Sequence, residues 1–267
     1  VGVYKLSKLL FNKQIALYTF IFFFFFSTFF GHMQINGRDT MILFCNIWIT
    51  FFSIKYLDFN YIKNKKYVIY LSCLAAVGMG VRFHFIATLI PLFIYIFYKI
   101  YMSSIKNKII FFKDLLKIIL FSSLIVFIFW EPVHSNFILK IQEIFNYNIQ
   151  MHWGWPYNMI NGNIFLTTNS PLNYIIEILF YKSPEYIIFL YLIFFIFLIP
   201  LTKNIKEEIK DFNLKIIFIL INVFYPTLLL FFFKIQVYDG LRLFLFLIPY
   251  FVLIPAVTFY YLIKNFS

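Results

Sequence analysis

Apolar residues follow one another in long runs along this chain, separated by short polar stretches. A run of about 20 residues spans the ~30 Å hydrocarbon core of a bilayer as a helix, at 1.5 Å per residue. The pattern therefore predicts an all-α fold, a polytopic bundle of about eight transmembrane helices. The expected spans are 14–30, 40–57, 67–81, 85–102, 116–130, 185–201, 215–233 and 241–263.

Residues 67–102 contain two of these spans in close succession. A single helix over this stretch would be ~53 Å long, which far exceeds the bilayer. Gly78, Gly80 and Arg82 interrupt the apolar run near its middle. We therefore expect a tight hairpin of two helices here, and eight spans then place alternate loops on opposite sides of the membrane.

The longest stretch without a span is 131–184. Apolar residues at helical spacing over 137–145 predict an amphipathic helix lying on the membrane, and 171–182 predicts a second one. Between them lies an aromatic turn region, His152 to Tyr157, followed by Asn161-Gly162-Asn163. We expect one transmembrane domain over 1–267 and, because the chain opens on Val1, the C-terminal part of a longer membrane domain.

Composition supports the membrane prediction. The chain is 63% hydrophobic and 13% charged, whereas a soluble domain carries about 25% charged residues. The net charge of +12 is spread over short loops between spans, which indicates topology and a lipid bilayer as partner, with no nucleic acid. Cys45 and Cys73 lie inside apolar runs and are expected to act as small buried hydrophobes.

Basic residues are divided unequally between the two predicted sides. Most of the 23 cations fall in alternate loops, which the positive-inside rule makes cytoplasmic. The outer side receives all four histidines, and its only cations are Arg38, Arg82, Lys140, Lys182, Lys234 and Arg242. All three arginines are thus outside, where topology does not require them, so we expect a functional site on that face.

The first candidate is Asn36-Gly37-Arg38-Asp39, at the start of the second span. A carboxylate beside an arginine could bind a divalent cation or a sugar hydroxyl, or assist proton transfer. The alternative is a structural role, in which Asp39 or Thr40 caps the helix that follows.

The second and third candidates centre on Arg82 and Arg242. Arg82, followed by His84, lies in an apolar hairpin, where a guanidinium either binds an anion such as phosphate or snorkels to the head groups. Arg242 follows Tyr238-Asp239 and either pairs with Asp239 as a surface ion bridge or points into the same outer cavity as Arg82.

The fourth candidate is the aromatic cluster with Trp153, Trp155 and Tyr157. Such residues are typical of the membrane interface, but their faces also stack on sugar rings and polyprenyl chains. No zinc spacing, catalytic triad or phosphate-binding glycine loop occurs in the sequence.

These stretches, taken in order, resemble the integral-membrane GT-C glycosyltransferases of the protein-mannosyltransferase and lipid-A-sugar-transferase type. The likeness lies in the cytoplasmic turn before an apolar span, the outer-loop Asp, the glycine-rich span ending in a basic residue, the Pro and Tyr segment before a Pro-initiated span, and the final Arg-then-Pro helix. The corresponding residues are 4–13, Asn36 to Asp39, Ala75 to Arg82 with Pro91, Ser170 to Pro184, and Tyr238 to Pro249.

The resemblance implies an inverting glycosyltransferase that moves a sugar from a polyprenyl-phosphate donor to a glycan, lipid or protein acceptor. It implies that Arg82 and Arg242 hold the donor phosphate, and that Asp39 supports the acceptor or a divalent cation. We place Arg38, His84, Tyr238, Asp239, Trp153, Trp155 and Tyr157 with the substrate-binding residues.

Two departures and two alternatives accompany this interpretation. The family's main catalytic carboxylates lie in a first outer loop, which is expected upstream of Val1, and Leu243 stands where relatives often have His. A transporter or flippase for a lipid-linked sugar would need polar residues at midmembrane depth, and the spans offer mainly Asn46 and Asn222. A non-catalytic membrane scaffold is the third option. We expect a bacterial plasma membrane location, with the active face outside.

Overall fold

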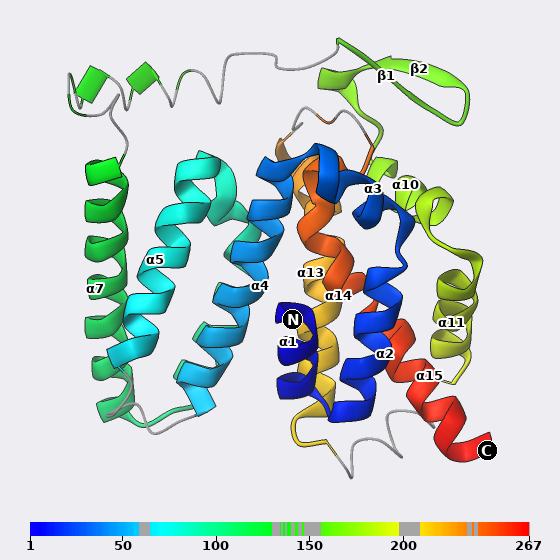
Figure 1. The fold of residues 1–267 in the computed structure, drawn as a ribbon, viewed down its shortest axis with the longest axis horizontal. Coiled ribbons are helices and arrows are strands. Elements are labelled where there is room, and N and C mark those ends of the chain that lie inside the picture. The colour runs from blue at the N-terminus through cyan, green and yellow to red at the C-terminus, as the bar shows by residue number, and fades with distance from the viewer. Residues whose placement is uncertain are drawn as a thin grey trace.

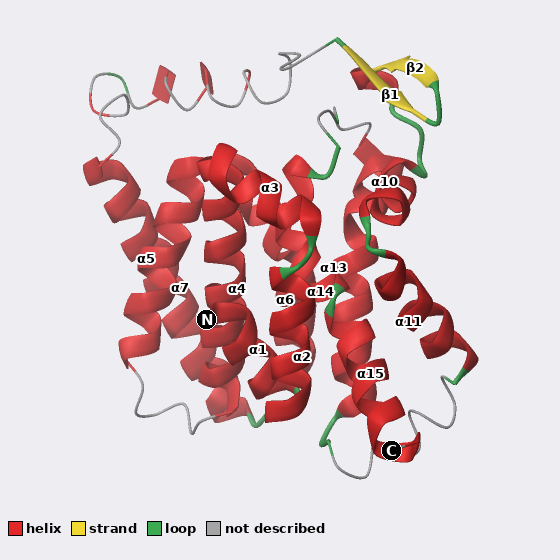
Figure 2. Cartoon of the chain, turned by 45° about the vertical axis from the view of Figure 1, so that its right-hand side comes forward, coloured by secondary structure: helices red, strands yellow, loops and turns green. Residues whose placement is uncertain are grey.

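The computed structural model describes residues 1–58, 65–129, 134, 136, 138–139, 142–143, 146, 156–197, 209–233, 237 and 240–266. Apart from one two-stranded hairpin, its regular elements are helices (Figures 1 and 2). This confirms the predicted all-α membrane bundle. The physical reason is that a backbone in hydrocarbon must satisfy its own N–H and C=O groups, which a helix does within one segment.

The first half of the chain contains α1 (Gly2–Leu10), α2 (Lys13–Phe24), α3 (Ser27–Ile35), α4 (Gly37–Asp58) and α5 (Lys65–Val81), then the 3-10 helix η1 (Phe83–Leu89), α6 (Ile90–Tyr101) and α7 (Ile105–Phe129). In Figure 1, α7, α5 and α4 stand side by side along one edge of the bundle. α5 packs between α4 and α7, and α1 packs against α2 and α4.

The second half contains the strands β1 (Tyr157–Ile160) and β2 (Asn163–Leu166), the 3-10 helix η2 (Thr167–Asn169), α10 (Tyr174–Lys182), α11 (Glu185–Ile196), α13 (Phe212–Phe233), the 3-10 helix η3 (Arg242–Leu247), α14 (Ile248–Phe251) and α15 (Leu253–Phe266). α15 packs against α2 and α11, and η3 packs against α4. Segments more than 200 residues apart in sequence therefore meet, as the Asp39–Arg242 contact shows.

The number of spans is lower than the predicted eight. In the described part of the chain, four helical stretches are long and apolar enough to cross a membrane: 37–57, 84–101, 212–232 and 242–265. Two bent pairs, α2 with α3 at 62° and α10 with α11 at 118°, raise the number to six if each counts as one span. The prediction of eight was wrong because two of the predicted spans are not long, uncharged helices. α5 is too short, and α7 carries charged residues through its first half.

The predicted break within 67–102 is confirmed. α5 ends at Val81, Arg82 has an extended backbone (φ −149°, ψ 123°), and η1 then starts the next span. At this bend the two arms approach closely, because a Cβ on Gly78 would lie 2.3 Å from the Phe85 ring. A side chain at position 78 would therefore force the Phe85 ring to move, so packing favours glycine there.

The loop 131–184 contains one of its predicted helices, α10, and a β-hairpin that was not predicted. α10 matches the helix expected at 171–182, while most of 137–145 lies outside the described residues. The hairpin β1–β2 was missed. Its turn has Asn161 at φ 50° and Gly162 at φ 77°, which is the two-residue turn that Asn-Gly favours.

Candidate functional site

Three charged side chains from distant parts of the chain meet at one end of the bundle, where α4 begins and α5 ends; we call this the Asp39 end. Nη2 of Arg82 lies 2.6 Å from Oδ1 of Asp39. Nε of Arg242 donates to the other carboxylate oxygen, Oδ2, at 3.0 Å. One carboxylate therefore holds two guanidiniums, one on each oxygen, and we call these three residues the ionic triad.

Asp39 is placed by the start of α4. It lies in the first turn of that helix, where the helix dipole favours a negative charge. Its side chain is only 5% exposed, so the carboxylate is removed from water and depends on the two arginines for its stabilisation. Of the two roles considered for Asp39, the structure shows pairing with both predicted arginines in addition to the helix-start position.

Arg82 is placed by the bend between α5 and η1. Its backbone N–H still donates to the carbonyl of Gly78 at 3.0 Å, and its carbonyl accepts from the N–H of Phe85 at 2.9 Å. The residue thus joins the last turn of one arm to the first turn of the other. From this point its side chain reaches Asp39 rather than extending alone into the head-group region.

Arg242 is placed by a turn that a buried tyrosine holds. Gly240, two residues earlier, has φ 65°, a left-handed conformation that glycine adopts without strain. The N–H of Gly240 donates to the hydroxyl of Tyr174 at 3.2 Å, and that hydroxyl also accepts from Nδ2 of Asn158 at 2.7 Å. Tyr174 is fully buried, so α10 and β1 together fix the approach to Arg242.

The ionic triad carries excess positive charge. Two guanidiniums surround one carboxylate, and their side chains are 18% exposed for Arg82 and 30% for Arg242. The buried anion thus lies beneath two cations that reach the surface. Such a site favours an anionic ligand, and guanidiniums suit phosphate oxygens best because they donate bidentate hydrogen bonds.

The same geometry does not favour a divalent cation at Asp39. Both of its oxygens already accept from guanidiniums, and a metal ion there would approach two positive charges. Among the described residues, no three His, Cys, Asp or Glu side chains gather as a set of metal ligands. Within the described part of the chain, the surroundings of Asp39 therefore do not fit the divalent cation that was considered from sequence.

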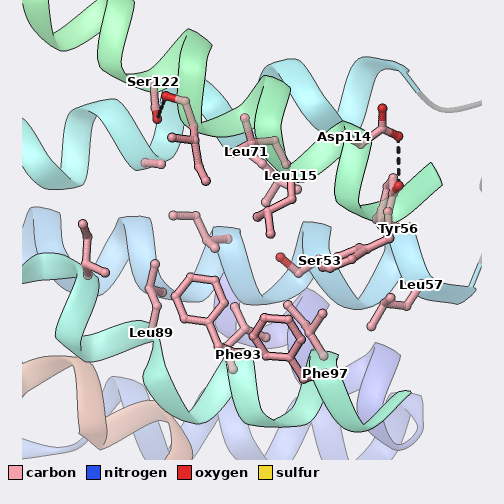
Figure 3. A pocket seen from close by; sticks show the side chains of 18 of the residues that line it. Ser53, Tyr56, Leu57, Leu71, Leu89, Phe93, Phe97, Asp114, Leu115 and Ser122 are labelled. Carbon is pink, nitrogen blue, oxygen red and sulfur yellow. Dashed lines mark hydrogen bonds between the residues drawn. The ribbon is translucent and has the colours of Figure 1, made fainter. Parts of the chain in front are cut away.

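An apolar cavity of about 510 Å³ lies between α4, α5, η1, α6 and α7 (Figure 3). Its lining includes Met79 and Phe85, which lie three residues before and three after Arg82. Its few polar residues include Asp114, whose carboxylate accepts from the Tyr56 hydroxyl at 2.9 Å and pairs with Lys117. The cavity therefore extends from just below Arg82 to the end of α4 opposite the Asp39 end.

The remaining predicted site residues are not part of the ionic triad. Arg38 precedes Asp39 directly but is exposed on a different side of α4, and His84 is exposed at the start of η1. Tyr157 is 62% exposed on β1. Trp153, Trp155, Tyr238 and Asp239 lie outside the described residues. Two alternatives were considered for Arg242: a surface ion bridge to Asp239, or a position beside Arg82. The contact with Asp39 places Arg242 beside Arg82.

Tyr174 and Asn158 were missed as parts of the site. A single Tyr at the start of a helix gives no sequence signal for a hydrogen bond to Gly240, 66 residues away. The hairpin that carries Asn158 did have a signal. Asn161-Gly162 stands between two short stretches of mixed apolar and polar residues, a pattern typical of a two-residue β-hairpin.

Fold and site together define a multi-pass helical membrane protein with a cationic cluster at one end. Residues 1–127, just under half of the chain, match the family model of the dolichyl-phosphate-mannose-protein mannosyltransferases. The match confirms the predicted resemblance to GT-C-type membrane glycosyltransferases over that part, which includes Asp39 and Arg82 but not Arg242. No curated protein and no solved structure matches the chain.

Proposed function

We propose that this protein is a GT-C-type glycosyltransferase that receives a sugar from a polyprenyl-phosphate donor at the Asp39 end. The observation that carries the proposal is the ionic triad, in which two partly exposed arginines share one buried carboxylate. The family match over residues 1–127 supports the class of enzyme. The nature of the donor rests on the charge and shape of the site.

In the proposed reaction, an oxygen of the acceptor hydroxyl forms a bond to the anomeric carbon of the sugar, with inversion. The bond from that carbon to the lipid phosphate oxygen breaks, and its electron pair leaves with the phosphate. Arg82 and Arg242 stabilise the growing charge on the phosphate, as preorganised donors do in other transfers. Because these donors are held by Asp39, little reorganisation is needed when the charge develops.

Asp39 has a positioning role in this scheme rather than that of a base. A general base needs an oxygen within hydrogen-bond reach of the acceptor hydroxyl, and both oxygens of Asp39 are engaged by guanidiniums. A separate general base must therefore accept the proton of the acceptor hydroxyl. None of the described residues is assigned to that role. Asp39 instead orients the two arginines and reduces their mutual repulsion.

The apolar cavity would receive the first part of the donor's isoprenoid chain. Its lining begins within one helical turn of Arg82, so a phosphate on the arginines places the adjoining hydrocarbon at its mouth. The mostly apolar lining of the cavity matches a hydrocarbon chain better than a sugar, since the carboxylate of Asp114 already accepts from Tyr56 and pairs with Lys117 (Figure 3). We therefore place the sugar on the solvent side of the arginines, toward the hairpin β1–β2.

We place the Asp39 end on the outer face of a bacterial plasma membrane. The lysine-rich loops are predicted to connect helices at the opposite end, and the positive-inside rule makes that end cytoplasmic. The acceptor, a glycan, lipid or protein, would then approach from outside.

A transporter or flippase is a weaker explanation of the same residues. It would use polar groups at midmembrane depth to bind its substrate. Asn46 is buried and bonded to Thr88 and Tyr250, and Asn222 donates to the carbonyl of Phe218 in its own helix. These amides serve internal contacts, so the described spans offer little for a second, inward-facing binding site.

The test measures binding of isoprenyl phosphates to the purified chain in lipid nanodiscs. We expect Arg82→Gln and Arg242→Gln each to weaken farnesyl phosphate binding about tenfold or more, the value of one charge-assisted contact. Lys99→Gln is the matched control, because Lys99 pairs with Asp211 at the opposite end of the bundle. Equal affinity in all three variants would refute the phosphate assignment.

A second variant tests the cavity. Ala75 lines it from α5, and Ala75→Phe fills part of the space. We expect this change to weaken binding of farnesyl phosphate but not of dimethylallyl phosphate, whose short chain ends before Ala75, about 10 Å along α5 from Arg82. The same loss for both ligands, or none for either, would contradict the assignment of the isoprenoid chain to this space.

A further inference from the structure

A buried polar network lies about 10 Å below the ionic triad, in the apolar part of the bundle. Its centre is Asn46, seven residues after Asp39 on α4 and 1% exposed. The Tyr250 hydroxyl donates to Oδ1 of Asn46 at 2.8 Å. Nδ2 of Asn46 donates to the carbonyl of Thr88 at 3.1 Å and lies 3.2 Å from the Thr88 hydroxyl. The side-chain amide thus bonds in both directions across the bundle.

Thr50 completes the network from the next turn of α4. Its hydroxyl lies 2.8 Å from that of Tyr250 and donates to the carbonyl of Asn46, also at 2.8 Å. Both residues are almost fully buried. The hydroxyl protons of Tyr250 and Thr50 therefore stay within the network, while the Thr88 hydroxyl donates to the carbonyl of Phe85 in η1.

Each segment that this network joins also carries one member of the ionic triad. α4 carries Asp39 above Asn46. The η1 segment carries Thr88 six residues after Arg82, which is its N-cap. Tyr250 lies in α14, eight residues after Arg242 at the start of η3. The network and the triad thus join the same three segments at two different depths in the bundle.

The two arginine-bearing segments need such a cross-link. η1 and η3 are 3-10 helices, and η3 is interrupted at Phe244 (φ −113°, ψ 19°). The N–H of Arg82 makes the last α-helical hydrogen bond of α5, to Gly78, but neither η1 nor η3 continues from its arginine as a regular α-helix. Other buried hydroxyls, such as Ser72 and Thr258, bond within their own helix and link nothing. The contacts of Asn46 instead tie α4 to both irregular segments.

We propose that Tyr250, acting with Asn46 and Thr50, is a positioning residue for the anion site. Its hydroxyl fixes the rotation and depth of the segment that begins at Arg242, so that both arginines meet Asp39 at once. In the apolar interior an unpaired polar group is costly, so the network has a strong preference for this one arrangement. The part of the inference that concerns donor binding rests on the proposed function.

Tyr225 provides a matched control. It is a buried tyrosine on α13, and among the residues that the structure describes its hydroxyl has no hydrogen-bond partner. Tyr250→Phe and Tyr225→Phe remove the same atom from the same residue type. Only the first removes a link to the segment that carries Asp39.

The experiment combines a double-mutant cycle with ligand binding. In wild-type, Tyr250→Phe and Tyr225→Phe backgrounds, Asp39→Asn and Arg242→Gln are introduced singly and together, and apparent Tm is measured in nanodiscs. Farnesyl phosphate affinity is measured in each background without these further changes. We expect the Tm shifts of the two charge variants to be strongly non-additive in wild-type and Tyr225→Phe, and at least half of that coupling to be lost in Tyr250→Phe.

We also expect Tyr250→Phe to weaken farnesyl phosphate binding about three- to tenfold, and Tyr225→Phe to leave it unchanged. Thr50→Val should lower the coupling in the same direction, and Thr50→Ser, which keeps the hydroxyl, should restore it. A lower Tm in Tyr250→Phe with full coupling and full affinity would overturn the inference, because the residue would then be merely structural. If Tyr250→Phe loses the coupling but no variant binds farnesyl phosphate, the wild-type protein included, the positioning role is supported and the proposed function is refuted.

Discussion

Replacing the carboxylate of Asp39 by an amide is the most direct perturbation of the ionic triad. Asp39→Asn keeps the size of the side chain but removes the negative charge between two guanidiniums, which lie 2.6 and 3.0 Å from its oxygens. Breaking a buried ion pair from one side costs roughly 3–5 kcal/mol. The arginines here are 18% and 30% exposed and regain some hydration, so we expect the lower end, about 3 kcal/mol.

A second ion pair in the same protein provides the comparison. Asp211 pairs with Lys99 at 2.5 Å, but these side chains are 39% and 29% exposed. Exposed pairs contribute about 1 kcal/mol or less, so Asp211→Asn should cost far less than Asp39→Asn. The assay is equilibrium unfolding in mixed detergent micelles, with the loss of helical signal as the readout.

The triad also predicts how the charge variants combine. With Arg242→Gln already present, Asp39→Asn removes one ion pair instead of two, so the double variant should recover about 1–2 kcal/mol relative to the sum of the singles. If Asp39→Asn costs no more than Asp211→Asn, or if the two charge changes add, Asp39 does not hold the arginines and the anion site loses its structural basis.

Two further predictions concern the bend at Arg82 and the ion pair at the opposite end. Gly78→Ala places a Cβ 2.3 Å from the Phe85 ring and should destabilise the protein by about 1–3 kcal/mol. Gly80→Ala is the control, because a Cβ there has nothing within 4 Å and should be tolerated. Thermal unfolding of the two variants compares them directly. The hydrogen bond from Lys99 lowers the pKa of Asp211, so this contribution to stability is present above the ordinary carboxyl pKa of about 4 and is lost as pH falls through the lowered value. A Tm–pH profile of Asp211→Asn should lack that acid-side component, and an unchanged profile would contradict it.

The sequence predicts the membrane bundle well where glycines or charged residues mark the ends of the apolar runs. Gly78, Gly80 and Arg82 mark a real bend, and α4 and α13 are each one continuous helix, the second in spite of Pro226. The break between α2 and α3 was missed, because it falls within a run of phenylalanines, where neither Gly nor Pro marks a bend. Hydropathy measures the preference for lipid, and it contains no term for the angle at which an apolar helix bends.

The partners within the site could be predicted only in part. The excess of arginines on one predicted face, which conflicts with the positive-inside pattern, indicated two of the three residues of the ionic triad, Arg82 and Arg242. The local sequence offered Asp239 as a neighbour of Arg242 but gave no indication of Asp39, 203 residues away, which Arg242 contacts. Such a pairing depends on how η3 packs against α4, and packing between distant segments leaves no periodic trace in one sequence.

The energetics of the ionic triad favour a binding role over a purely structural one. A buried ion pair gains little over apolar side chains of similar volume, because desolvation offsets most of the Coulomb attraction. Here the balance is poorer still, since the second guanidinium adds repulsion that one carboxylate cannot cancel. On the proposed function, an anion bound between the partly exposed faces of Arg82 and Arg242 offsets the net positive charge of the triad and stabilises the arrangement. Ligand-dependent stabilisation follows from mass action: farnesyl phosphate should raise the Tm of the wild-type protein more than that of Arg82→Gln, and an equal rise in both would show that the ligand binds elsewhere.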